Sequence, residues 1–154
     1  MTYVVVEHTE FPFAKGDLTS DGTQWSAEKD TTTADVDVEV ESVIIKPPAL
    51  GEMLEVEFGL TAAFRAVSSS TADLKYKWQA RNKGGTWVDL HSQVTKTNIG
   101  TTYIEETRSG RFKKVTNFDS IPFEVRLIIQ CNEVNEGRAK IKNSSYVRVK
   151  YATS

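Results

Sequence analysis

The sequence contains few residues of the kinds that form disulfides and metal sites. Cys131 is its one cysteine, which excludes a disulfide within the chain and a cysteine-based zinc cluster. The two histidines, His8 and His91, leave little for a histidine metal site. We therefore expect no metal and no cofactor.

Signals for secretion and for membrane insertion are also missing. The first residues, Met1–Glu7, lack a basic start and a long apolar stretch, so we expect no secretion signal. No apolar run approaches the ~20 residues that a membrane-spanning helix needs. We expect no association with a membrane.

Catalytic motifs are absent from the sequence. It has no Gly-x-Ser-x-Gly elbow, no His-Glu-x-x-His helix and no glycine loop that would hold a phosphate. Four acidic residues alternate along one predicted strand, where neighbours on one face lie ~6.5–7 Å apart, which is too far for one strand to surround a calcium ion. These four are Asp35, Asp37, Glu39 and Glu41, and we interpret them as a solvated face. The sequence therefore predicts a protein that is not an enzyme.

The dominant positive signal is alternation of apolar and polar residues. With 154 residues, of which 39% are hydrophobic and 10% aromatic, the chain is long enough to bury a core. A period of two residues is typical of a strand with one buried and one wet face. Gly59 lies inside the longest such stretch and predicts a bulge or a bend. The predicted strands cover 35–41, 54–66, 74–81, 123–132 and 147–151.

The segments between the strands are rich in turn-forming residues. Asn82–Gly85 predicts a hairpin between two strands that contain tryptophan, and Lys46–Gly51 predicts a link between two others. Short strands at short intervals predict an all-β protein, an antiparallel β-sandwich that is either immunoglobulin-like or a jelly roll. We expect a single domain over 1–154, with 8–34 as a long loop or arm.

Charge is divided unevenly along the chain. Residues 1–57 contain 13 acidic and 3 basic residues, whereas residues 58–154 contain 8 acidic and 16 basic residues. Acidic and basic strands that pair within one domain would explain this division, and so would complementary surfaces on neighbouring copies. Nucleic-acid binding is a third explanation, since a short basic loop surrounds Phe112. This loop lacks interleaved aromatic residues, so we do not expect nucleic-acid binding. Its basic residues are Arg108, Arg111, Lys113 and Lys114.

The aromatic residues allow two interpretations. Trp78 shares a face with Leu74 and Tyr76 and is expected in the core, as is the thiol of Cys131. Trp87 is expected to pair across the hairpin. A flat exposed row of Trp25, Tyr103 and Tyr146 would stack on sugar rings, whereas packing within the fold is the simpler alternative.

Two stretches resemble known β-sandwich proteins. Tyr76–Leu90, in which a strand with Trp78 turns through Gly84 and Gly85 into Thr-Trp-Val-Asp-Leu, resembles a hairpin of immunoglobulin-like domains in phage and bacterial surface proteins. The runs Pro122–Leu127 and Gly137–Val149 resemble the closing strands of small virion β-sandwich proteins. The resemblance implies a module that coats or decorates a larger assembly.

These observations predict a structural protein of a phage particle, such as a capsid decoration or tail protein, that is assembled in the host cytoplasm and forms an oligomer. Its partners would be neighbouring subunits of the particle, held by aromatic anchors and basic residues. The candidate partner-binding residues are Phe11, Phe13, Trp25, Arg108, Arg111, Lys113 and Lys114. The alternatives are a carbohydrate-binding or adhesion module and, third, an enzyme whose site around His91 forms only in the fold.

Overall fold

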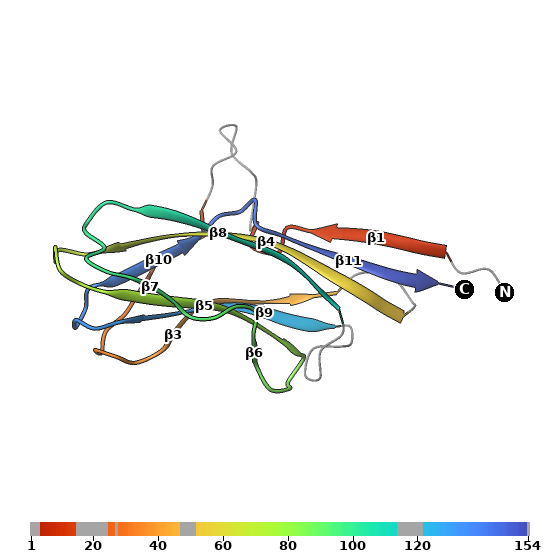
Figure 1. The fold of residues 1–154 in the computed structure, drawn as a ribbon, viewed down its shortest axis with the longest axis horizontal. Helices are drawn as coiled ribbons and strands as arrows, with labels where there is room; N and C mark the ends of the chain where they lie inside the picture. The colour runs from red at the N-terminus through yellow and green to blue at the C-terminus, as the bar shows by residue number, and fades with distance from the viewer. Residues whose placement is uncertain (1–3, 15–24, 27, 47–51, 114–121, 154) are drawn as a thin grey trace.

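The structure is a computed structural model that describes residues 4–14, 25–26, 28–46, 52–113 and 122–153. Two antiparallel sheets face each other in a β-sandwich, and the described residues contain no helix (Figure 1). The all-β sandwich predicted from the alternation is therefore confirmed. The predicted link at Lys46–Gly51 lies outside the described residues from position 47 onward.

The first sheet is built around its longest strand, β4. One side of β4 pairs with β8, and its other side pairs with β11 and then β10, which follow each other along it. β1 pairs with the far side of β11, and β2 with the far side of β10. The strands are β1 (Val4–Glu10), β2 (Lys29–Asp30), β4 (Glu52–Ala66), β8 (Ile104–Lys113), β10 (Gly137–Ile141) and β11 (Tyr146–Thr153).

The second sheet has β9 next to β5 at its centre. β3 pairs with the free side of β9, and the short strands β6 and β7 pair with β5. The strands are β3 (Val38–Ile45), β5 (Leu74–Asn82), β6 (Val88–Asp89), β7 (Val94–Lys96) and β9 (Phe123–Cys131). The hairpin predicted at Asn82–Gly85 joins β5 to β6.

The strand pairs are nested along the chain. β1 pairs with β11, β3 with β9, β4 with β8, and β5 with β6 and β7, and successive pairs lie in alternate sheets. A long antiparallel hairpin rolled up in this manner is a jelly roll. Of the two sandwich types that the sequence allows, the topology is therefore the jelly roll.

The core lies between the facing sides of the two sheets. Alternate residues of the long strands point into it, as the sequence pattern predicts, and Trp78 and Cys131 are buried there. Burial raises the pKa of the Cys131 thiol, which is consistent with an inert core residue. The largest fully buried side chains are Trp78, Tyr76, Phe13, Phe58, Phe64, Phe123, Ile45, Leu60, Leu74, Leu127 and Ile129.

Gly59 does not lie in a bulge, which is the first of the two alternatives that the sequence allows. Gly59 pairs regularly with Tyr146 on one side and Ser109 on the other, and the register shift of this region falls between Lys150 and Tyr151. A Cβ atom at position 59 would lie 2.2 Å from Cε1 of Tyr146. The glycine is needed because the tyrosine ring lies against its backbone.

Much of the described part of segment 8–34 belongs to the sandwich. The residues from His8 to Glu10 continue β1, and Lys29–Asp30 form β2. Phe13 is 1% exposed and its ring packs edge-on against Trp78, with 5.9 Å between centroids. Residues 15–24 and 27 lie outside the described part of the chain, and for them the long loop or arm stays a prediction.

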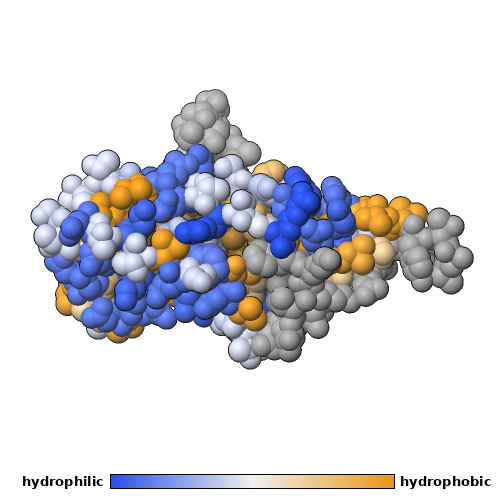
Figure 2. Space-filling model, viewed as in Figure 1, coloured by the Kyte–Doolittle hydropathy of each residue, from blue (hydrophilic) through white to orange (hydrophobic). Residues whose placement is uncertain are grey.

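The first sheet is longer than the second at one end. β1, β11 and the start of β4 extend together toward the two termini, beyond the end of β9 (Figure 1). Hydrophobic side chains are visible at this end in Figure 2, and Val4 and Val5 are 55% and 56% exposed. Within the described ranges, no helix is long and apolar enough to cross a membrane.

Candidate interaction surface

The outer face of the first sheet carries rows of alternating charge. In the first row, Glu7 of β1 lies opposite Lys150 of β11, and Lys150 lies opposite Glu55 of β4. Lys150 Nζ is 3.5 Å from Glu7 Oε1 and 3.9 Å from Glu55 Oε2. The next register position, on β8, is Lys113.

A second row runs parallel to the first on the same face, two residues further along each strand. Arg148 of β11 donates to Thr9 Oγ1 at 2.9 Å and to Glu57 Oε2 at 3.0 Å. Arg111 of β8 lies opposite Glu57 and is 3.9 Å from Glu55, and its side chain is 69% exposed. The charged side chains of the two rows surround a shallow hollow of about 70 Å³.

These rows explain part of the uneven division of charge. Acidic strand β4 lies between β11 and β8, which carry basic residues of the second part of the chain. The same pairing of early acids with late bases joins Asp30 to Arg138 and Glu39 to Arg126. The acidic and basic parts therefore pair within one domain, which is the first of the explanations that the sequence allows.

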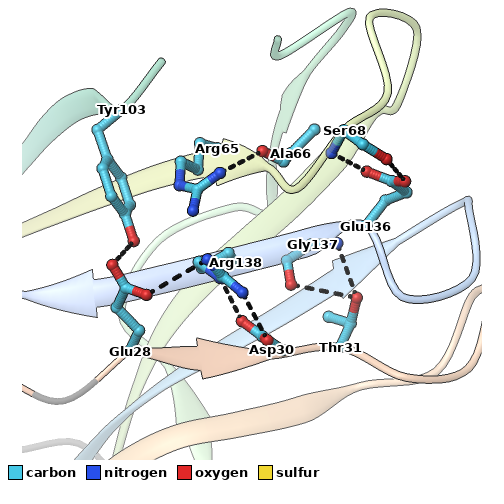
Figure 3. Close-up of polar contacts among 10 residues, drawn as sticks. All are labelled: Glu28, Asp30, Thr31, Arg65, Ala66, Ser68, Tyr103, Glu136, Gly137 and Arg138. Carbon is cyan, nitrogen blue, oxygen red and sulfur yellow. Dashed lines mark hydrogen bonds and ion pairs between the residues drawn. The ribbon is translucent and has the colours of Figure 1, made fainter. Parts of the chain in front are cut away.

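A second polar cluster fixes β2 to β10 (Figure 3). The Arg138 guanidinium donates to Asp30 at 2.6 Å and 2.9 Å and lies 3.5 Å from Glu28. Its hydrogen bonds lower the pKa of Asp30. Tyr103 donates to Glu28 at 2.5 Å, and burial together with this bond raises the pKa of Tyr103 to about 12.

The loop after β4 is held by a carboxylate from the loop before β10. Glu136 accepts from the hydroxyl of Ser68 at 2.6 Å and from the backbone N–H groups of Ser68 and Ser69 at 2.8 Å and 2.9 Å (Figure 3). These bonds lower the pKa of Glu136 to about 2. The cluster orders the end of the sandwich opposite the extended strands.

The partly exposed aromatic rings are covered by cations. The Lys140 ammonium lies 4.8 Å from the ring centre of Trp25 and 4.1 Å from that of Tyr103. The guanidinium carbons of Arg81 and Arg126 lie 4.2 Å and 4.0 Å from the ring centre of Trp87. These contacts favour packing within the fold over a flat row of free rings.

A cavity of about 410 Å³ opens between the two sheets near Trp25. Its walls combine aromatic and polar groups from β2, β3 and the neighbouring segments. The lining residues are Phe13, Trp25, Ser26, Glu28, Lys29, Val40, Glu41 and Asn143. The volume and this mixture suit a small polar ligand.

The predicted basic loop is a strand. Arg108 and Arg111 belong to β8 and point to opposite faces, because Arg108 donates to the hydroxyl of the buried Tyr76 at 3.2 Å whereas Arg111 lies in the outer rows. Lys113 is the last residue of β8, and Lys114 lies outside the described residues. The structure therefore divides this cluster between the two faces.

The three aromatic anchor candidates lie in different environments. Phe11 is 54% exposed, Phe13 is buried in this chain's own core, and Trp25 is partly exposed beside Lys142. The sequence could not separate Phe11 from Phe13, because both precede an irregular segment without periodicity. Their role in binding a partner stays a prediction.

His91 holds the segment between β6 and β7 against β5. Its Nε2 accepts from the backbone N–H of Trp78 at 3.0 Å, so Nδ1 carries the proton and donates to the carbonyl of Ser92 at 2.8 Å. Both ring nitrogens are thus engaged by the backbone. In the part of the chain that the structure describes, no group of three or more His, Cys, Asp and Glu side chains could hold a metal ion.

The free energy of unfolding is expected to decrease as the pH is lowered through the range where His91 titrates. Burial first, and the nearby Arg108, lower the pKa of His91 below 6.5, while Asp89 and the bond to Ser92 raise it less. The unfolded chain therefore takes up a proton before the folded one, so stability is complete above pH 6.5 and decreases as pH falls toward the folded pKa. Urea unfolding of the protein and of His91→Gln at pH 7.5 and pH 5.5 measures this difference.

The control for this titration is His8→Gln, because the His8 ring pairs with Glu10 on the surface. In the unmodified protein the urea midpoint should be lower at pH 5.5 than at pH 7.5. We expect His91→Gln to make this difference in midpoint smaller, and His8→Gln to show the same difference as the unmodified protein. An unchanged pH dependence in His91→Gln would contradict the lowered pKa of His91 in the folded chain.

Comparisons with known proteins show distant structural similarities but no family. No protein-family model and no curated protein matches the sequence. Among solved structures, the chain is similar to infectious bursal disease virus of the Gx strain, with a TM-score of 0.49 and 10% identity over 96% of this chain and 37% of that one. It is also similar to the VP2 subviral particle of the same virus, with a TM-score of 0.45 and 14% identity over 97% of this chain and 32% of that one.

A protein from a bacterium is similar as well. Dimeric latent PorU from Porphyromonas gingivalis has a TM-score of 0.40 and 9% identity over 99% of this chain and 13% of that one. The chain spans about a third of the length of the viral chains that it matches. The chain thus has a distant structural similarity to parts of these viral and bacterial chains.

Proposed function

We propose that this protein is a structural, non-enzymatic component of a virus particle that binds neighbouring protein subunits. The observation that carries the proposal is the jelly-roll sandwich whose first sheet extends past the second and ends in a strand with exposed valines that no other described strand covers. Jelly rolls are the architecture of many capsid domains. An uncovered edge with exposed apolar residues favours contact with another chain.

The interior of the fold supports a structural role. The core between the sheets is built from large buried side chains, and both nitrogens of His91 are bound to the backbone. Several charged groups on the outer faces form ion pairs between neighbouring strands. A rigid body with a projecting edge is suited to a fixed place in an assembly.

Sedimentation through a sucrose gradient tests the proposed function. We expect the purified protein, added to particles from the source of the sequence that have been stripped of it, to sediment with those particles in a saturable manner. Bovine serum albumin at the same concentration is the control and should stay at the top. Protein that remains at the top under all salt conditions would contradict the proposal.

Carbohydrate binding is the second candidate function, and the cavity of about 410 Å³ beside Trp25 favours it. A sugar would stack on an aromatic wall and bond to the carboxylate and amide groups of the lining. If this candidate is right, Trp25→Ala will abolish binding on a glycan array, and Trp87→Ala, on the opposite sheet, will preserve it. Binding that is absent from the unmodified protein would remove this candidate.

A further inference from the structure

We propose that copies of this chain join edge to edge, with β1 of one copy pairing antiparallel with β8 of the next. The inference names a partner for the proposed structural role and so rests on that role. It arises from two features of the first sheet, which are its two edges and the charges on these edges.

β1 and β8 are the two edges of the same four-strand run. β1 pairs only with β11 and β8 pairs only with β4 within the described residues, so each offers one unpaired side of its backbone. Every step across β1, β11, β4 and β8 is antiparallel. A neighbouring β1 placed beside β8 would therefore continue the antiparallel pattern, and open edges readily accept another strand.

The charges on the two edges are complementary. β1 contains Glu7 and Glu10 but no lysine or arginine, whereas β8 ends in a stretch with Arg111 and Lys113. The Glu7 side chain is 54% exposed at one edge and the Arg111 side chain is 69% exposed at the other. Each has room for a further ion pair beyond the one within its own chain.

The register continues the alternation across the junction. The first row runs from negative Glu7 through positive Lys150 to negative Glu55, and the following position on β8 is Lys113. With the rows aligned, the neighbour's Glu7 falls beside Lys113 and one diagonal from Arg111. Opposite charges in directly facing strand positions stabilise pairing, and like charges there disfavour it.

The aligned register also fixes how far the two strands overlap. Glu7–Glu10 of the neighbour face Lys113–Gly110 of β8, and Val4 and Val5 extend past the last residue of β8. Because the two joined edges are different, the contact is heterologous and builds a closed ring or an open chain of subunits.

A charge-reversal experiment in the analytical ultracentrifuge tests this pairing. The full chain should form species larger than a monomer at about 0.05 M salt and dissociate toward about 0.5 M salt, since exposed charges are screened. Glu7→Lys and Arg111→Glu should each raise the dissociation constant at least about tenfold, because like charges then meet at the junction. An equimolar mixture of the two variants should associate again, since the introduced lysine of one variant then meets the introduced glutamate of the other, and the native Glu7 meets the native Arg111.

The matched controls reverse an ion pair away from the two edges. Glu39 and Arg126 lie 3.2 Å apart on the second sheet, and Glu39→Lys and Arg126→Glu should associate like the unmodified chain. Circular dichroism melts of each variant show that it is folded. A monomeric unmodified chain, a folded edge variant that still associates normally, or a mixture that stays dissociated would each overturn the proposal.

Two further outcomes separate this inference from the proposed function. A chain that is monomeric at low salt but sediments with virus particles contradicts the edge-to-edge pairing and supports the structural role. A chain that associates as described but never sediments with particles contradicts the structural role and supports the pairing. If only Glu7→Lys weakens association, β1 pairs with itself and the proposed pairing with β8 is wrong.

Discussion

Replacing Trp78 with alanine is expected to lower the free energy of unfolding by about 3–5 kcal/mol, the usual cost of removing a large aromatic side chain from a core. Trp78 is 0% exposed and packs against the ring of Phe13. Its indole nitrogen has no hydrogen-bond partner among the described residues, so the loss comes from packing alone. Urea unfolding followed by circular dichroism measures the change.

The matched control is Trp87→Ala on the outer face of the second sheet. Trp87 is partly exposed and contacts the guanidinium groups of Arg81 and Arg126. Exposed cation–π contacts contribute about 0.5–1 kcal/mol, so this variant should lose far less stability. Equal losses in the two variants would show that Trp78 does not lie at the centre of the sandwich.

Gly137→Ala is expected to lower the free energy of unfolding by about 1–3 kcal/mol through overpacking. A Cβ atom at this position would lie 2.8 Å from Thr31 Oγ1 and 2.9 Å from Cys131 Cβ. Thr31 and Cys131 are each 1% exposed, so neither has room to move. The Gly137 N–H also donates to Thr31 Oγ1 at 2.9 Å. The added methyl group would therefore also disturb this hydrogen bond, which joins β10 to the residue after β2.

Differential scanning calorimetry of Gly137→Ala gives this loss as a decrease in melting temperature, about 2–4 °C for each kcal/mol in a chain of this size. Ser144→Ala, at an exposed position in the turn after β10, is the control and should change stability by less than about 0.5 kcal/mol. A Gly137→Ala protein that melts at the unmodified temperature would contradict the close contact with Thr31.

The long strands could be predicted from the sequence because each has one face in the core. In β4, β5 and β9 an apolar residue recurs at every second position over most of the strand, as in Leu74, Tyr76 and Trp78, and the structure buries all three. The alternation of β4 breaks at its start, where the register shifts and Leu54 is exposed. The edge strand β8 could not be recognised this way. Its inward positions include Glu106 and Arg108, which bind Lys96 and Tyr76 at the open side of the sandwich, so its apolar alternation is lost.

The surface features depend on which residues face each other on neighbouring strands, and the sequence alone does not predict this register. The excess of acid before residue 58 and of base after it is visible in the sequence, and pairing within one domain was one explanation for it. The rows that join Glu7, Lys150 and Glu55 emerge only once β11 is placed between β1 and β4. Strand β2 has two residues, and its place is fixed by Arg138 and Thr31 rather than by any local pattern.

The most direct measurement of the structural role is mass spectrometry of intact virus particles purified from the source of this sequence. The account predicts the chain in many copies per particle, in a fixed ratio to the principal coat protein that repeats between preparations. A particle population without the chain, together with abundant chain in the particle-free fraction of the same lysate, would contradict it.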